Sequence, residues 1–253
     1  MIKYILYLNS AELQKKGSSI LTIRYWWVII TYIIMQFSAP ILIILFSIDN
    51  METRIYLSIS SFILALIIVL LLMKPDMQAK LKNGIHNKSE IILWSIIGIF
   101  MAYFAQGFAT IIELFLFGSL PGSENTQEIM GIARSLPLFM IIPAIIAPIL
   151  EEIIFRKIIF GSLYKRTNFF IAAIISAFIF GIIHGEPEHI LVYASMGLVF
   201  AFLYIKTDSI LTPIIVHMGL NSFAVITQFN LDPEDFRKMQ EQFENLQFIL
   251  IGG

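Results

Sequence analysis

Two adjacent acidic residues, Glu151 and Glu152, lie within a long apolar stretch of the sequence, and Arg156 follows them. Four residues of an α-helix turn the chain through about 400°, so Glu152 and Arg156 share a helix face and can form an ion pair. Glu151 lies about 100° away from that face and has no such partner within its own segment. An unpaired carboxylate in apolar surroundings is well suited to act as a general base.

Two later apolar stretches each carry a histidine. Glu151 and His184 are equally far in sequence from a turn at residues 167–168, so two antiparallel helices would place them at the same depth. His217 and Asn221 are four residues apart and share one face of a third helix. Amide hydrolysis needs a base for water, N–H donors for the developing oxyanion, and an acid for the leaving amine. A carboxylate, two imidazoles and an amide can supply these groups.

Each of these residues also has a structural interpretation. The Glu152–Arg156 pair could simply lock two helices together. His184 could lie at the membrane interface, and His217 could be a hydrogen-bonded core residue. An ionisable group inside a membrane span is costly, however, which favours a functional role. Residues 184–189 resemble the zinc signature HExxH, but their histidines are five residues apart and a proline intervenes, so we reject that match.

The elements that would position these residues are membrane-spanning helices. Hydrophobic residues make up 58% of the 253 residues, and charged residues only 14%. Because a soluble domain usually carries about 25% charged residues, we expect lipid to be the solvent of this chain. The predicted fold class is therefore all-α, a polytopic transmembrane helix bundle of about seven spans. The apolar stretches long enough, or nearly so, to cross the membrane are residues 20–46, 55–73, 91–118, 137–160, 169–185, 189–205 and 210–229.

Charged residues between the spans alternate in sign along the chain. Lysine and arginine dominate the segment before the first span and the loops after the second, fourth and sixth spans, whereas acidic residues dominate the other loops. By the positive-inside rule, the N-terminus is cytoplasmic and the C-terminus lies outside, which fits a protein of the plasma membrane. The N-terminal residues lack the pattern of a cleavable signal peptide. Glu113, near the outer end of the third span, is expected to extend toward the membrane surface.

Net charge and cysteine content exclude several classes of function. A formal net charge of −1, without a basic stripe interleaved with aromatic residues, argues against nucleic-acid binding. The sequence has no cysteine, which excludes disulfides, thiolate metal sites and cysteine nucleophiles. It also shows no inverted repeat of the kind typical of transporters, so ion or proton transport is the less favoured use of the buried acids.

We divide the chain into three parts. Residues 1–136 hold spans one to three, residues 137–229 hold the candidate catalytic core of spans four to seven, and residues 230–253 form an acidic tail. Apolar residues recur every three to four positions in this tail, which predicts an amphipathic helix that lies on the membrane or binds a partner. Pro143 and Pro148 precede the two glutamates and should free backbone carbonyl groups near them.

Residues 137–229 contain three motifs in order, each on its own predicted span: Glu151-Glu152-x-x-x-Arg156, Phe180-x-x-x-His184 and His217-x-x-x-Asn221. Together they resemble the motifs of the CPBP intramembrane protease family, which includes CAAX prenyl endopeptidases and bacteriocin-processing or immunity proteins. Glu152 and Arg156 match the second glutamate and the arginine of that family. Many members have glycine where this chain has Lys157, a difference that we expect to alter packing more than chemistry.

The resemblance implies an all-helical membrane core and hydrolysis of a peptide bond near the bilayer. It also implies roles for single residues. Glu151 and His184 correspond to the residues that activate water in the family. His217 and Asn221 correspond to those that stabilise the oxyanion.

We therefore predict an intramembrane endopeptidase that cleaves a membrane-associated protein or peptide. The alternative is a membrane scaffold or immunity protein that binds a peptide or partner without cutting it. Glu151, His184 and His217 also form a carboxylate and two imidazoles, a set that binds zinc in catalytic sites. A metal-free route, in which Glu151 and His184 activate water unaided, fits the same residues. We favour a divalent metal such as zinc, because a cation would offset the buried carboxylate charge.

Overall fold

The structure is a computed structural model, and every regular element within the residues it describes is a helix. No strand occurs in that part of the chain, so the predicted all-α fold is confirmed. The tail predicted to be amphipathic and the N-terminal segment lie mostly outside the described residues. The described residues are 22–82, 88–118, 122–231, 238 and 242.

The helices follow one another along the chain with short connections. The first four are α2 (Ile23–Leu45), α3 (Met51–Lys82), α4 (Lys88–Phe117) and α5 (Glu124–Ser135). The fourth predicted span consists of five consecutive pieces, η1 (Pro137–Met140), η2 (Ile142–Ile146), α6 (Ala147–Glu152), η3 (Ile153–Phe160) and α7 (Gly161–Tyr164). The last four elements are α8 (Phe169–Ile183), η4 (Pro187–His189), α9 (Ile190–Thr207) and α10 (Leu211–Asn230).

Six helical segments of the described chain are long and apolar enough to cross a membrane, and they coincide with six of the predicted spans. The remaining span, α8, is apolar but has only 15 residues. Its length of about 22 Å is less than the roughly 30 Å of hydrocarbon in a bilayer. α8 ends at His184, its C-terminal cap, and Gly185 takes a left-handed conformation with φ of 74° that turns the chain. α8 by itself is therefore shorter than the hydrocarbon thickness of a typical bilayer.

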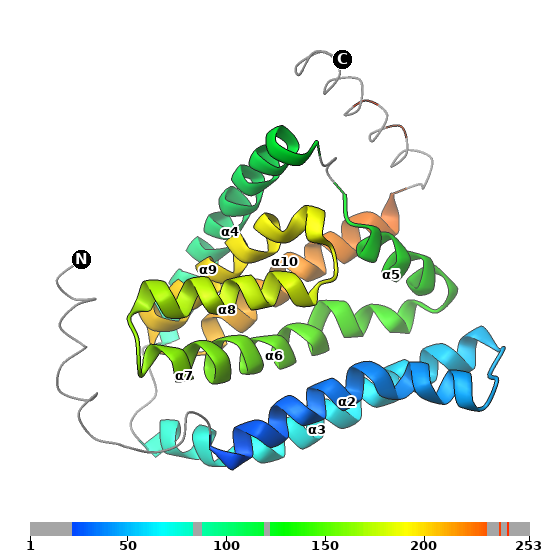
Figure 1. The fold of residues 1–253 in the computed structure, drawn as a ribbon, viewed down its shortest axis with the longest axis horizontal. Helices are drawn as coiled ribbons and strands as arrows, with labels where there is room; N and C mark the ends of the chain where they lie inside the picture. Colours follow the sequence, from blue (N-terminus) through cyan, green and yellow to red (C-terminus); the bar gives the residue numbers. More distant parts are fainter. Residues whose placement is uncertain (1–21, 83–87, 119–121, 232–237, 239–241, 243–253) are drawn as a thin grey trace.

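Figure 1 shows how these helices are arranged. α2 and α3 lie side by side as a hairpin along one side of the molecule, and the segment from η1 to α7 runs next to them. α8 and α9 pack antiparallel beside that segment, while α10 and α4 lie behind them. The short helix α5 lies at one end of the bundle, against η1 and α10.

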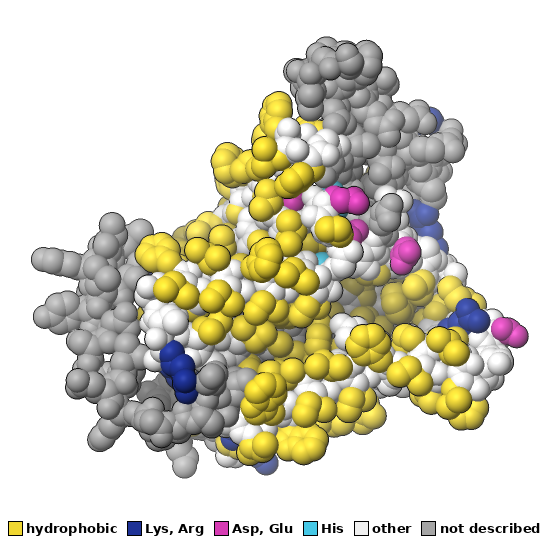
Figure 2. All heavy atoms as spheres, viewed as in Figure 1, with side chains coloured by type: hydrophobic (Ala, Val, Ile, Leu, Met, Phe, Trp, Pro, Cys, Tyr) yellow, Lys and Arg dark blue, Asp and Glu magenta, His cyan; other side chains and the backbone are white. Residues whose placement is uncertain are grey.

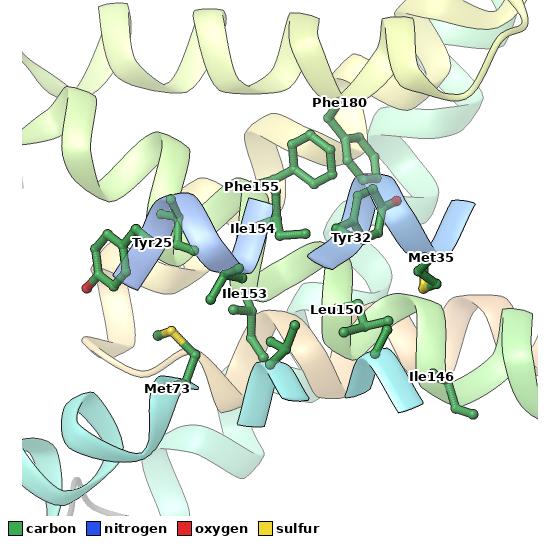
Figure 3. Packing of buried hydrophobic residues seen from close by; sticks show 14 residues of the cluster. Tyr25, Tyr32, Met35, Met73, Ile146, Leu150, Ile153, Ile154, Phe155 and Phe180 are labelled. Carbon is green, nitrogen blue, oxygen red and sulfur yellow. The ribbon is translucent and has the colours of Figure 1, made fainter. Parts of the chain in front are cut away.

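The α2–α3 hairpin is held against α6 and η3 by a cluster of buried side chains (Figure 3). Lipid tails are as apolar as these side chains, so the contact is stabilised by close packing rather than by removal from water. The hairpin contributes Tyr25, Tyr32, Met35, Val69 and Met73, and the fourth span contributes Ile146, Leu150, Ile153, Ile154 and Ile158.

The fourth span is not a regular α-helix. Two π-helical segments, η2 and η3, flank α6, which carries both candidate glutamates. The N–H of Ala147 donates to the carbonyl of Ile142, five residues back, and Pro148 has no N–H to continue this pattern. The carbonyl of Pro143 is thereby left for a donor from another helix. Local π-helix of this kind is frequent at functional sites.

Helices α8 and α9 approach each other closely through small residues. A Cβ added at Gly197 of α9 would lie 3.0 Å from Cα of Ala177 on α8. A Cβ added at Gly181 of α8 would lie 3.0 Å from the carbonyl oxygen of Ile190. Small residues at such contacts let helix backbones pack tightly within a membrane. This contact holds the end of α8, and with it His184, against the start of α9.

We expect Gly197→Ala to destabilise the protein, because the new methyl group must push α8 away. Overpacking of this kind typically costs about 1–3 kcal/mol in the free energy of unfolding. Gly107 of α4 offers a matched control, since a Cβ added there meets nothing within 4 Å. Gly107→Ala should leave stability unchanged or raise it by up to about 1 kcal/mol. Thermal unfolding in detergent measures both variants, and equal midpoints would contradict the close contact.

Candidate active site

Glu152 and Arg156 form the ion pair that their spacing predicts, and the pair is completely enclosed. The Arg156 Nε atom lies 3.1 Å from the Glu152 Oε2 atom, and the two side chains are 1% and 0% exposed. The guanidinium group also lies against the rings of Phe180 and Phe200, with its central carbon 4.3 and 4.9 Å from their centroids. Aromatic faces attract a cation at these distances. Arg156 therefore connects η3 to α8 and α9.

His217 of α10 lies between the two glutamates. Its Nδ1 atom is 2.8 Å from Glu152 Oε1, and its Nε2 atom is 3.7 Å from Glu151 Oε2. The ring is buried and stacks on Phe200, with centroids 4.9 Å apart. A carboxylate paired with a guanidinium accepts hydrogen bonds, so Nδ1 of His217 donates to Glu152. The Nε2 atom of His217 is left to face Glu151.

These four side chains form a buried charge cluster, defined by Glu151, Glu152, Arg156 and His217. Arg156 offsets the charge of Glu152. Such pairing avoids the cost of an isolated charge in surroundings of low dielectric constant.

His184 is held at the end of α8 by its own helix and by two aromatic rings. Its Nδ1 atom lies 2.7 Å from the carbonyl oxygen of Phe180, which can only accept, so Nδ1 carries the proton. The Nε2 atom of neutral His184 then has a free lone pair. The imidazole stacks on the Tyr193 ring at 3.9 Å between centroids and meets the Phe180 ring edge-on at 4.5 Å.

Glu151 and His184 line one pocket. The structure therefore brings together the two residues that their equal distance in sequence from the turn predicts to lie at the same depth. The Glu151 side chain is 15% exposed, and the pocket encloses about 240 Å³. In Figure 2, acidic side chains and a histidine gather near α5 and the α8–α9 connection, on a face that is otherwise mostly hydrophobic. The residues that line the pocket are Tyr32, Gln36, Asn125, Glu151, Phe155, Ile183 and His184.

The structure places Asn221 differently from the pocket residues. Its Nδ2 atom donates to the carbonyl oxygen of Pro143 at 3.0 Å, the carbonyl left without a helical donor by Pro148. Neither Asn221 nor His217 lines the pocket directly. Both lie on α10, whereas the pocket is formed by α2, α5, α6, η3 and α8.

Sequence reasoning missed three polar residues of the pocket wall. Gln36 is an amide within a mostly apolar predicted span, and this polar residue was an available signal. Tyr32 and Asn125 gave none, because their position depends on how α2 and α5 pack against the fourth span.

Glu113 does not extend to the membrane surface, and that prediction was wrong. Its side chain is 1% exposed and accepts the N–H groups of Leu191 and Val192 at 2.7 and 3.0 Å. His189 Nδ1 lies 3.2 Å from the same carboxylate. Glu113 therefore caps the start of α9, where free N–H groups favour a negative charge.

The predicted zinc site is not formed by these residues. Within the described part of the chain, no group of three His, Cys, Asp or Glu side chains could hold a metal ion. The Phe180 ring packs on both His184 and His217, with centroid distances of 4.5 and 6.0 Å. Glu151 and His217 alone would supply too few ligands.

Comparison with known proteins identifies the family. A protein-family model described as Type II CAAX prenyl endopeptidase Rce1-like matches residues 133–223. The chain is 45% identical over 242 residues to the protein named "Putative membrane peptidase YdiL" of Bacillus subtilis (strain 168), covering 91% of this chain and 98% of that protein. The chain belongs to the Rce1-like CAAX protease family.

Two further relatives extend the comparison. The chain is 33% identical over 238 residues to "Membrane-embedded CAAX protease MroQ" of Staphylococcus aureus (strain USA300), covering 88% of this chain and 96% of that protein. It is 26% identical over 167 residues to "UPF0177 protein YxdF" of Lactococcus lactis subsp. lactis (strain IL1403), covering 64% and 91%. No solved structure matches the chain. Its membership of the Rce1-like family and its apolar helices identify an integral membrane protease.

The charge cluster leads to a stability prediction for this Rce1-like protein. Removing one member of a buried ion pair strands the other charge, typically at about 3–5 kcal/mol. We therefore expect Glu152→Gln and Arg156→Gln each to lose stability, and the double variant to lose less than the sum. The exposed pair of Arg54 and Asp49, 3.7 Å apart, provides a control whose coupling should stay below about 1 kcal/mol. Double-mutant cycles in thermal unfolding measure both couplings, and additive losses at Glu152 and Arg156 would contradict the pair.

Proposed function

We propose that this Rce1-like chain is an intramembrane endopeptidase in which Glu151 and His184 activate water. The observation that carries the proposal is the contrast between the two adjacent glutamates. Glu152 is 0% exposed, and its carboxylate lies against Arg156 and His217. Glu151 is 15% exposed and faces the pocket that it shares with His184. Of the two carboxylates, Glu151 is the one that can reach both a water molecule and a substrate carbonyl.

The reaction follows from these positions. Glu151 takes one proton from water while the water oxygen forms a bond to the carbonyl carbon of the substrate. The Nε2 lone pair of His184 accepts a hydrogen bond from the second hydrogen and orients the water, because Nδ1 is occupied by the Phe180 carbonyl. As the C–N bond breaks, the carboxylic acid of Glu151 gives its proton to the leaving nitrogen.

We assign His217 and Asn221 to the oxyanion that forms on the substrate carbonyl. Neither lines the pocket itself, but His217 lies behind its wall, with Nε2 3.7 Å from Glu151 Oε2. Glu152 occupies Nδ1 of His217, so Nε2 can donate only when the ring is protonated. A protonated His217 balances the charge of an ionised Glu151. The same protonation state of the charge cluster therefore provides Glu151 as the base and His217 Nε2 as a donor. Asn221 uses one N–H on the Pro143 carbonyl and retains a second for the oxyanion.

A protein or peptide at the bilayer is the substrate class that this site fits. The pocket contributes amide side chains from Gln36 and Asn125 in addition to Glu151 and His184. Amides can donate and accept, so they suit the backbone of an extended peptide. Because the names of the family and of one relative refer to CAAX proteins, assays should include a prenylated C-terminal peptide beside the same peptide without the prenyl group.

Orientation and domain division remain part of this proposal. We retain the plasma membrane location, the cytoplasmic N-terminus and the external C-terminus that loop charges predict. Residues 1–136 would then support the catalytic core of residues 137–229, chiefly through the α2–α3 hairpin.

The catalytic assignment predicts that Glu151→Ala, His184→Ala and His217→Ala each lower turnover by about 10²–10⁴-fold while the protein stays folded and inserted. Combining two of them should cost little more than one, because residues that act as a unit are not additive. Glu188 is a control, since its exposed side chain is outside the pocket and Glu188→Ala should cleave normally. Turnover of a quenched peptide in detergent or nanodiscs measures the effect. Near-normal turnover of Glu151→Ala would reject the assignment.

No step of the proposed reaction requires a metal ion, so we expect cleavage to persist after metal removal. The measurement is elemental analysis of the purified protein, followed by turnover with and without a strong chelator. Zinc add-back after chelation completes the series. Loss of turnover with chelator and its recovery with zinc would contradict the metal-free mechanism and restore the zinc site favoured on sequence alone.

A further inference from the structure

Glu186, in the connection between α8 and η4, binds donors from two separate parts of the fold. Ser123 Oγ donates to its carboxylate at 2.8 Å, and the backbone N–H of Asn125 donates at 2.9 Å. Both donors belong to the start of α5. The hydroxyl of Tyr193, on α9, donates to the same carboxylate. Burial alone would raise the pKa of Glu186, but the hydrogen bonds from Tyr193, Asn125 and Ser123 outweigh it and lower the pKa below its ordinary value.

Tyr193 connects this carboxylate to the active site. Its ring stacks on the imidazole of His184, with centroids 3.9 Å apart and planes inclined by 22°. Phe180 also contacts His184, both with its ring and with the carbonyl that accepts from Nδ1. The imidazole therefore has little freedom to rotate as long as the Tyr193 ring stays in place.

The hydroxyl of Tyr193 is the point at which that ring is fixed. A tyrosine ring can slide or rotate unless its polar end is anchored, and Glu186 is the anchor here. Glu186 cannot follow such a movement, because Ser123 and Asn125 hold its carboxylate from the α5 side. Ser123 is itself fixed as the N-terminal cap of α5, where its Oγ accepts the N–H of Thr126.

We propose that Glu186 and Tyr193 are positioning residues, which hold the His184 imidazole so that Nε2 faces the water beside Glu151. This inference rests on the proposed function. It adds two residues that lie outside the three motifs and are not among the predicted site residues. Neither residue needs to touch the substrate. A misplacement of about 1 Å at a catalytic group can cost up to about 100-fold in rate, so indirect control of this kind is consequential.

A set of variants separates the effect of the Tyr193 hydroxyl, which Glu186 anchors, from the effect of the stacked ring. Tyr193→Phe retains the stacked ring but loses the hydroxyl, and Glu186→Gln retains the size of the side chain but weakens its hydrogen bonds. Tyr193→Leu removes the ring altogether. Glu188→Gln is the matched control, because Glu188 is an exposed acid in η4, two residues from Glu186. Each variant is assayed as full-length protein in nanodiscs.

Two readouts are needed. The first is turnover: we expect Tyr193→Phe and Glu186→Gln to lower kcat by about 10- to 100-fold with KM changed less than about threefold. Tyr193→Leu should lose at least as much, and Glu188→Gln should match the unmodified protein. The second is NMR of ¹⁵N-labelled histidine, which is practicable because the chain has only four histidines. Signals of His184 should shift in Tyr193→Phe and Glu186→Gln, while those of His217 stay in place.

If Glu186 and Tyr193 only stabilised the fold, their substitution would not shift the NMR signals of His184 alone in the protein that remains folded. Tyr193→Phe with unchanged kcat would overturn the proposal, whatever the NMR shows. A lowered kcat with unmoved His184 signals would overturn it too, because the effect would then pass through another group. If Glu151→Gln still cleaved the peptide, the proposed function would fail by itself. In that case the His184 signals would still show whether Glu186 and Tyr193 position the imidazole, because NMR signals do not depend on turnover.

Discussion

The Glu152 carboxylate is the group on which the rest of the site depends. It is wholly enclosed in a protein whose solvent is lipid, so its charge must be matched by neighbours. Arg156 supplies the balancing charge from the next turn, and His217 supplies a hydrogen bond from α10. This one carboxylate therefore joins the fourth span to the last. Because Glu152 pairs with Arg156 and with Nδ1 of His217, Glu151 stays free to face the pocket. Nε2 of His217 is then turned toward Glu151.

Periodicity in the sequence predicts much of this arrangement, for identifiable reasons. The apolar stretches are long, and helical spacing alone pairs Glu152 with Arg156 and places His217 with Asn221. The depth of Glu151 and His184 follows from counting residues along two antiparallel helices. Membrane spans are well suited to such arguments, because lipid forces the backbone into helices.

Contacts made at helix ends and connections could not be predicted in the same way. Glu113, Glu186 and Tyr193 acquire their partners only when α4, α5 and α9 are packed together. The zinc prediction considered which ligands were present and not how they are arranged, and among the described residues no group of three His, Cys, Asp or Glu side chains could hold a metal ion. The partner of Asn221 depends on a departure from helical hydrogen bonding at Pro143 and Pro148. Proline predicts such a departure, but not which side chain will use the freed carbonyl.

The shortness of α8 has a consequence for the lipid around the protein. Its neighbours, α9 and the segment from η1 to α7, are 18 and 28 residues long, whereas α8 has 15. A bilayer that meets a helix about 8 Å too short adjusts by thinning locally, at a cost of a fraction of a kcal/mol per Å of mismatch. Such thinning beside α8 would bring headgroups and their water closer to the buried glutamates. Hydrolysis within a membrane requires water at the scissile bond, and hydrophobic mismatch at one short helix provides a physical route for it.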